Sequence, residues 1–257
     1  MSKSSRRGAT RWLEPIVSGL WPLFLVWTAV VAAIWGGGIG EAELAGYVSN
    51  AGLRDALALL LRILDPVWLL LAAANVYVAI AAAEHLTVAR RWALLLLGAF
   101  FVAAAASAMV GLPLGPVHYT GRLGMKLGVV PLAFCLLFFV IVVGARDLAA
   151  RLWRRGGQIQ LSIATGFLAV VTDLNMEPLA WKIRAWWLWY PANLEAPKLP
   201  PISNYLTWFL LAAGCTFFMR SSRVAPHSRT PNTAPWLMLC VLNGVFLLTH
   251  AAGLLRR

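Results

Sequence analysis

Charged side chains are scarce in this sequence: they make up 12% of its 257 residues, about half the share found in an ordinary soluble domain. Hydrophobic residues account for 60% of the chain, and its mean hydropathy is +0.73. This composition excludes an ordinary soluble globular domain and predicts an all-α polytopic membrane protein. We expect residues 1–257 to form a single integral membrane domain.

Cysteine is also rare. The three cysteines each lie alone in an apolar run, and no CxxC pair is present; they are Cys135, Cys215 and Cys240. The sequence therefore gives no sign of a disulfide framework or a zinc site, and we interpret the cysteines as buried structural thiols. We expect no bound metal and no cofactor.

Acidic residues are few: 10 Asp and Glu stand against 22 Lys and Arg, which gives a net charge of +12. A nucleic-acid partner is not expected, because no basic face is interleaved with exposed aromatic residues outside the apolar runs. The basic residues instead form short runs between apolar segments, and such a bias orients membrane proteins. The first apolar run is long and lacks a clear cleavage site, which predicts an uncleaved first helix. The distribution predicts a cytoplasmic N terminus and an outer C terminus.

Glycine, proline and charged residues divide the hydrophobic sequence into about seven predicted spans. Residues 39–62 mix charged and apolar residues at helical spacing, and we predict that they lie in the membrane interface. Seven spans with the N terminus inside would place Asp65, residues 111–126 and residues 173–204 on one outer side. The predicted spans are 16–35, 63–83, 93–110, 127–143, 159–172, 205–219 and 235–253.

Two of the few acids occur where an apolar run should leave the membrane, in the sequence TDLNMEP. Carboxylates at such a position are costly and by default indicate function. Asp173 and Glu177 are four residues apart, so they share one face if the helix continues. Two close carboxyl groups in a poor dielectric resist joint ionisation, which would leave one as an acid and the other as a base. Alternatively, the helix simply emerges and Asp173 is hydrated, or Glu177 caps a helix beginning at Pro178.

A tryptophan-rich segment follows these acids. Such a cluster is typical of an aromatic belt at the membrane surface, and it also suits a wall around a long apolar ligand, where aromatic faces can stabilise a cation. Its members are Trp181, Trp186, Trp187 and Trp189.

Histidine and lysine limit the cofactor chemistry. His118 and Tyr119 lie in a loop rich in glycine and proline, as the polar tip of a turn or as donors directed into a pocket. His118 and His250 would have to face one cavity to hold a haem. None of the lysines lies in the last predicted helix, which argues against a retinal Schiff base; they are Lys3, Lys126, Lys182 and Lys198.

Two segments resemble the bacterial and archaeal carotenoid biosynthesis membrane family, which includes carotenoid 1,2-hydratases and bisanhydrobacterioruberin hydratases. The first is PLGPVHYTGRLGMKLGVVPLAF, residues 113–134. It departs from the family pattern at Leu114, where phenylalanine is usual, and at Val117–Tyr119, where one tyrosine replaces two. The preceding stretch, 107–111, lacks a glutamate that the family often has. The second segment carries Asp173, Pro178, Trp187, Trp189, Pro201, Asn204, Tyr205 and Trp208.

The resemblance covers residues 111–219. It implies an enzyme that adds water across a terminal isoprenoid double bond of an acyclic or monocyclic carotenoid by acid–base carbocation chemistry, without a cofactor. It implies Asp173 as the acid and Glu177 as the base or water-holding group, with Asn204 and His118 orienting the water. The expected substrate-binding residues are Tyr119, Trp187, Trp189, Tyr205 and Trp208.

The expected partners are the carotenoid, the lipid bilayer and other enzymes of the carotenoid pathway, and the expected location is the inner (plasma) membrane, as a multi-pass protein. Two other classes compete with the hydratase. One is a carotenoid- or lipid-binding membrane protein without catalysis. The other is a transporter or haem protein that uses the intramembrane acids or the two histidines.

Overall fold

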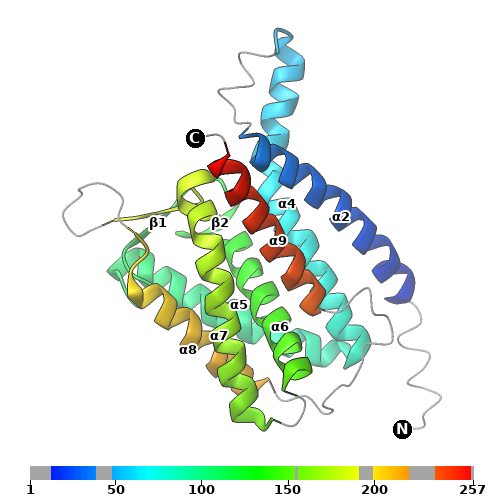
Figure 1. Ribbon diagram of the computed structural model, residues 1–257, viewed down its shortest axis with the longest axis vertical. Coiled ribbons are helices and arrows are strands. Elements are labelled where there is room, and N and C mark those ends of the chain that lie inside the picture. The colour runs from blue at the N-terminus through cyan, green and yellow to red at the C-terminus, as the bar shows by residue number, and fades with distance from the viewer. Residues whose placement is uncertain (1–12, 39–47, 154–155, 191–198, 220–234, 256–257) are drawn as a thin grey trace.

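The computed structural model describes residues 13–38, 48–153, 156–190, 199–219 and 235–255. In these residues the chain forms a bundle of seven α-helices, with a π-helical turn and two short antiparallel ribbons at one end (Figure 1). The helices are α2 (Leu13–Gly37), α4 (Ala51–Ala83), α5 (Leu86–Val110), α6 (Leu132–Leu152), α7 (Gln158–Glu177), α8 (Ile202–Phe218) and α9 (Pro235–Leu254). The other elements are η1 (Pro178–Ile183), β1 (Val117–Tyr119), β2 (Lys126–Leu127), β3 (Val130–Pro131) and β4 (Trp187–Trp189).

The helices have the length and surface of membrane spans. Among the described residues, six stretches are long and apolar enough to cross a bilayer, and α8 is a shorter apolar helix of 17 residues. Large apolar side chains such as Leu94 and Phe167 are exposed on the outer surface of the bundle. Such a surface is suited to contact with lipid rather than with water. The predicted all-α polytopic bundle is confirmed, and the protein is an integral membrane protein.

The connections divide between the two ends of the bundle. The start of α2 and the end of α9 lie at opposite ends (Figure 1). The ribbons, η1 and the start of α4 share the end at which α9 finishes, whereas the α4–α5 and α6–α7 connections lie at the other. The polar segments predicted to gather on one side are therefore at one end of the bundle. That this end faces outward stays a prediction.

Helix α4 corrects the predicted start of the second span. It runs without interruption from Ala51, so the break expected before residue 63 is absent; residues 39–47 lie outside the described residues. The Asn50 side chain caps its start by accepting from the Leu53 N–H at 3.0 Å, and Pro66 lies inside the helix. A helix of 33 residues is about 50 Å long and exceeds the roughly 30 Å apolar core of a bilayer. Its first turns accordingly project beyond the bundle (Figure 1).

Further boundaries differ from the sequence-based prediction. The helix expected from residue 93 begins at Leu86, and the helix expected to end at residue 143 continues to Leu152. The helix expected from residue 127 begins at Leu132, because Gly124 and Gly128 take positive φ angles of 75° and 61° and turn the chain into the β2–β3 ribbon. The helix expected to end at residue 172 continues to Glu177 and then passes into η1. Extra π-type turns of this kind frequently occur at functional sites.

Helix α6 forms the centre of the bundle. It is the most deeply buried of the spanning helices and contacts α4, α5, α7 and α9. Its Phe138 stacks on Phe100 of α5 with ring centroids 4.3 Å apart, and Trp208 of α8 lies 5.1 Å from Phe138. These aromatic contacts pack α8 and α5 against α6.

The α7–α8 contact depends on Gly166. A Cβ atom at this position would lie 2.8 Å from Cδ2 of Phe209 and 3.0 Å from its carbonyl oxygen. Gly166→Ala should therefore force the two helices apart and lower the free energy of unfolding by about 1–3 kcal/mol. Thermal unfolding in detergent measures the effect. Gly98→Ala is the matched control, since nothing lies within 4 Å of its added Cβ; equal melting temperatures for the two variants would contradict the prediction.

Candidate active site

Asp173 and Glu177 form a buried carboxylate pair on the last turn of α7. Their exposed fractions are 0% and 2%, so Asp173 is not hydrated at an emerging helix end. Glu177 makes no side-chain capping bond to η1. The Asn204 side chain on α8 donates from Nδ2 to Asp173 Oδ2 at 2.7 Å and to Glu177 Oε1 at 3.2 Å. One buried amide therefore bridges both acids, and the helix continues far enough to put them on one face.

Strand β4 covers Glu177 with two indoles. Nε1 of Trp189 donates to Glu177 Oε2 at 3.2 Å, and Nε1 of Trp187 lies 3.4 Å from the same oxygen. Successive side chains of a strand point to opposite faces, so residues two apart point the same way. The strand geometry thus turns part of the tryptophan cluster into a pair of buried N–H donors rather than a surface belt.

The pairing of β1 with β4 determines which way the His118 and Tyr119 side chains point. Tyr119 lies directly opposite Trp187 and His118 opposite Leu188. Residues directly opposite in an antiparallel pair share a face, so Tyr119 is on the face that meets Glu177 and is buried. His118 is exposed on the other face, with its ring 6.1 Å from that of Tyr190. The structure does not bring His118 to the carboxylates, because strand alternation points the two neighbours in opposite directions.

The Tyr119 hydroxyl is a free donor inside the protein. It is buried and has no hydrogen-bond partner among the described residues. Burial raises the pKa of the Tyr119 phenol, and the charge of nearby Glu177 adds to this rise. The phenol therefore stays protonated and can donate to a small polar group bound beside it.

Aromatic rings enclose the pair. We call Phe134, Trp187, Trp189 and Trp208 the aromatic wall. Phe134 lies 4.5 Å from the Trp187 ring and 6.5 Å from that of Trp208. Trp208 is fully buried, whereas Tyr205, one residue after Asn204, is half-buried. With Trp187 and Trp189 in contact with Glu177, these rings form a continuous aromatic cluster beside the carboxylate pair.

A second buried acid lies beside the first site. Asp65 of α4 is 1% exposed and forms an ion pair with Arg184, with Nη2 3.0 Å from Oδ2. Trp35 and Trp186 also donate to it from their indole nitrogens, at 3.1 and 2.6 Å. Sequence reasoning placed Asp65 at the same end of the bundle as the carboxylate pair but missed Arg184. A buried acid within an apolar run needs a cationic partner. This requirement is the sequence signal that could have prompted a search for an arginine such as Arg184.

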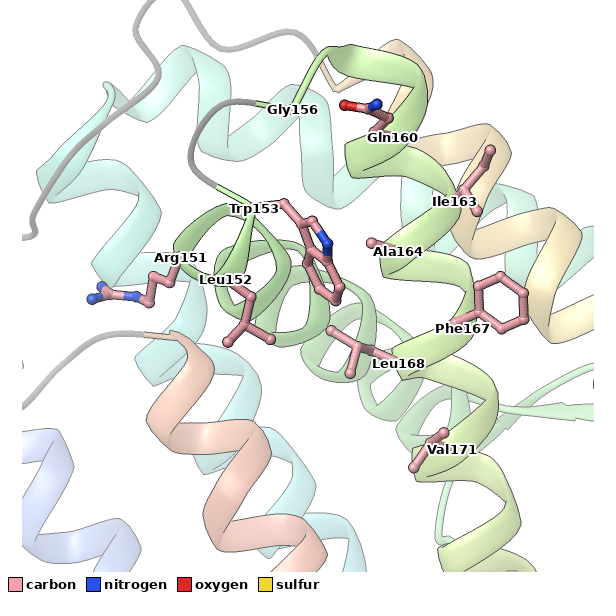
Figure 2. Close-up of a pocket in the computed structure, with 10 residues that line it drawn as sticks. All are labelled: Arg151, Leu152, Trp153, Gly156, Gln160, Ile163, Ala164, Phe167, Leu168 and Val171. Atoms are coloured by element: carbon pink, nitrogen blue, oxygen red, sulfur yellow. The ribbon is translucent and has the colours of Figure 1, made fainter.

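The cavity shown in Figure 2 is separate from this site. Its volume is about 1040 Å³, and it lies between the end of α6 and residues 160–171 of α7. It is lined by Arg151, Leu152, Trp153, Gly156, Gln160, Ile163, Ala164, Phe167, Leu168 and Val171. Ala164 and Val171 lie on a different face of α7 from Asp173, which is turned toward α8. The cavity therefore does not open onto the carboxylate pair.

Fold and site together define a polytopic membrane protein with a buried, amide-bridged carboxylate pair beneath an aromatic wall. A family model described as "Carotenoid biosynthesis protein" matches residues 64–256, which is most of the chain. The protein therefore belongs to this family, as the two segments indicated, and has a role in carotenoid biosynthesis. No match was found among curated proteins or among solved structures. Asp65 and every candidate site residue fall within the matched region.

Proposed function

We propose that the protein is a carotenoid hydratase that adds water across a terminal isoprenoid double bond of an acyclic or monocyclic carotenoid. The observation that carries the proposal is the unequal environment of the two buried acids. Glu177 receives three N–H donors, from Trp187, Trp189 and Asn204. Asp173 receives one, from Asn204, and its Oδ1 is buried without a partner among the described residues.

This inequality assigns the proton. Hydrogen bonds to a carboxylate favour its charged form, so Glu177 is the ionised member and Asp173 carries the proton. The proton resides on Oδ1, the oxygen that receives no N–H from the described residues. A protonated carboxyl group facing an ionised one provides an acid and a base within one turn of helix.

The reaction then follows in two steps. The π electrons of the terminal double bond take the proton of Asp173, a C–H bond forms at the less substituted carbon, and the other carbon becomes a tertiary cation. The carboxylates and the aromatic wall stabilise that cation. Water attacks the cation to form the C–O bond, and Glu177 takes the released proton. Return of a proton from Glu177 to Asp173 restores the starting state.

The water needs a donor and an acceptor to hold it. Asn204 bridges the acids, and the Tyr119 hydroxyl, which has no partner among the described residues, lies on the ribbon face that meets Glu177. We assign the orientation of the water to these two residues, and not to His118. Trp208 and the half-buried Tyr205 border the path of the polyene.

The solubility of the proposed substrate indicates where in the cell the protein would act. A carotenoid dissolves in the bilayer, so we place the protein in the plasma membrane, where it would receive the polyene from other enzymes of the carotenoid pathway. A carotenoid-binding protein without turnover is the second candidate, because the aromatic wall and the complete burial of Glu177 suit a tightly held apolar ligand as well.

Expression in a strain that accumulates lycopene or γ-carotene tests the proposal. Hydratase activity predicts a new carotenoid whose mass has increased by one water. A purified protein that carries unmodified carotenoid, seen as a three-peaked absorption band in the blue, with no hydrated product in the cells would favour the binding protein and reject the hydratase.

A further inference from the structure

We propose that Asp65 is a positioning residue for the carboxylate site: it fixes the turn at residues 184–186 and thereby holds the indole donors of Trp187 and Trp189 on Glu177. The inference rests on the proposed function for its effect on turnover, while its effect on the Glu177 environment is independent of that function.

Both oxygens of Asp65 are fully used. Arg184 donates from Nε to Oδ2 at 3.1 Å and from Nη2 to Oδ1 at 3.2 Å, and Trp186 donates to Oδ2 at 2.6 Å. Trp35 on α2 donates to Oδ1 at 3.1 Å. A carboxylate with this many donors at 1% exposure has no free position for substrate, so Asp65 acts through its neighbours rather than on the reacting atoms.

The turn that Asp65 holds is strained. Ala185 has a φ of 49°, in the left-handed region that a residue with a Cβ rarely adopts. This conformation lets Arg184 and Trp186, on either side of it, reach the same carboxylate. Such a backbone state persists only where its surroundings hold it in place, and the buried Asp65 contacts supply that restraint.

The turn also sets the register of β4. Thr120, just after β1, donates from its backbone N–H to the Trp186 carbonyl at 3.0 Å and from its hydroxyl to the Ala185 carbonyl at 2.6 Å. Trp186 points to Asp65, and the next residue, Trp187, points to Glu177. A shift of Trp186 therefore changes the direction of the adjacent donors, because consecutive strand residues alternate.

A double variant, Asp65→Asn/Arg184→Gln, removes both charges and leaves no unpaired buried ion, so the chain should still fold. An asparagine has one acceptor oxygen in place of the two that Asp65 uses, and a glutamine at position 184 cannot replace the paired N–H donors of the guanidinium, so the turn loses part of its anchor. The matched control is Asp147→Asn/Arg151→Gln, which neutralises the 3.4 Å ion pair near the other end of the bundle. Trp186→Phe keeps an aromatic ring, although a smaller one, and removes the N–H donor, and it provides a second test.

Two readouts separate positioning from simple support. One is the split between kcat and KM for hydration. The other is labelling by dicyclohexylcarbodiimide, which reacts with protonated carboxyl groups in membranes, read at Glu177 by peptide mass spectrometry. We expect kcat to fall about tenfold with KM unchanged, and labelling of Glu177 to increase, because a carboxylate that loses its indole donors binds a proton. Trp186→Phe should shift both readouts in the same direction.

Wild-type kcat and wild-type labelling in the Asp65 variants would overturn the inference. If the wild-type protein shows no hydration, the labelling alone decides: increased labelling of Glu177 in the variants would support positioning while rejecting the hydratase, and unchanged labelling would reject the positioning role as well.

Discussion

Asp173→Asn is expected to abolish hydration while the protein still folds. The amide keeps nearly the shape of the acid but cannot deliver a proton to the alkene, and loss of a general acid costs about 10²- to 10⁴-fold in rate. Asp173 is already the neutral member of the pair, so a neutral amide at this fully buried position changes no buried charge and the bundle should keep its stability. The measurement is product formed per folded protein in the carotenoid-accumulating strain.

Glu177→Gln provides the comparison for this experiment. Its side-chain oxygen still accepts an indole N–H and a water hydrogen but cannot take a proton, so we expect a loss smaller than for Asp173→Asn and at least as large as the loss that follows removal of the indole donors. Near wild-type turnover in Asp173→Asn would show that Asp173 is not the acid. The proton would then have to come from Glu177 or from another group.

The second large loss of turnover is expected when the indole N–H donors of Trp187 and Trp189 are removed. Trp187→Phe/Trp189→Phe keeps two aromatic rings over Glu177 but removes both N–H donors. Hydrogen bonds to a charged group contribute about 1.5–3 kcal/mol each, so we expect turnover to fall by about 10- to 100-fold or more as Glu177 takes up a proton and ceases to be a base. Carotenoid binding should change little.

Trp153→Phe is the control for these substitutions, because Trp153 is half exposed at the other end of the bundle. It should keep wild-type turnover. If the double variant at positions 187 and 189 also keeps wild-type turnover, then the indole donors do not set the charge of Glu177, and the assignment of acid and base loses its support.

The helices were predictable because each depends on a local signal. Apolar runs of spanning length, separated by glycine, proline or charge, are sufficient to locate a membrane helix. The helix boundaries were harder to predict where proline or glycine is present. Pro66 lies inside α4 without ending it, whereas Gly124 and Gly128 form a ribbon that delays the start of α6. A single proline need not end a membrane helix, since neighbouring groups can satisfy the backbone.

The site was predictable in part. Asp173 and Glu177 are four apart on one helix, so their meeting needs only that the helix continue. The pairing of Asp65 with Arg184 joins positions 119 residues apart, and no spacing rule reports such a contact. The expectation that His118 lies beside the carboxylates differs from the structure for a similar reason: β1 has only three residues and pairs with β4 far along the chain. Without that register, nothing in the sequence distinguishes the buried Tyr119 from the exposed His118.

The most direct test of the central claim is hydration in heavy water. The purified protein, reconstituted in vesicles with an acyclic carotenoid, would be incubated in D₂O and its product analysed by mass spectrometry and NMR after back-exchange in H₂O. Hydration by a protonated Asp173 predicts one hydroxyl group and one deuterium that stays bound to the neighbouring carbon. Recovery of the unchanged carotenoid, or of a hydroxylated product with no carbon-bound deuterium, would contradict the proposed mechanism.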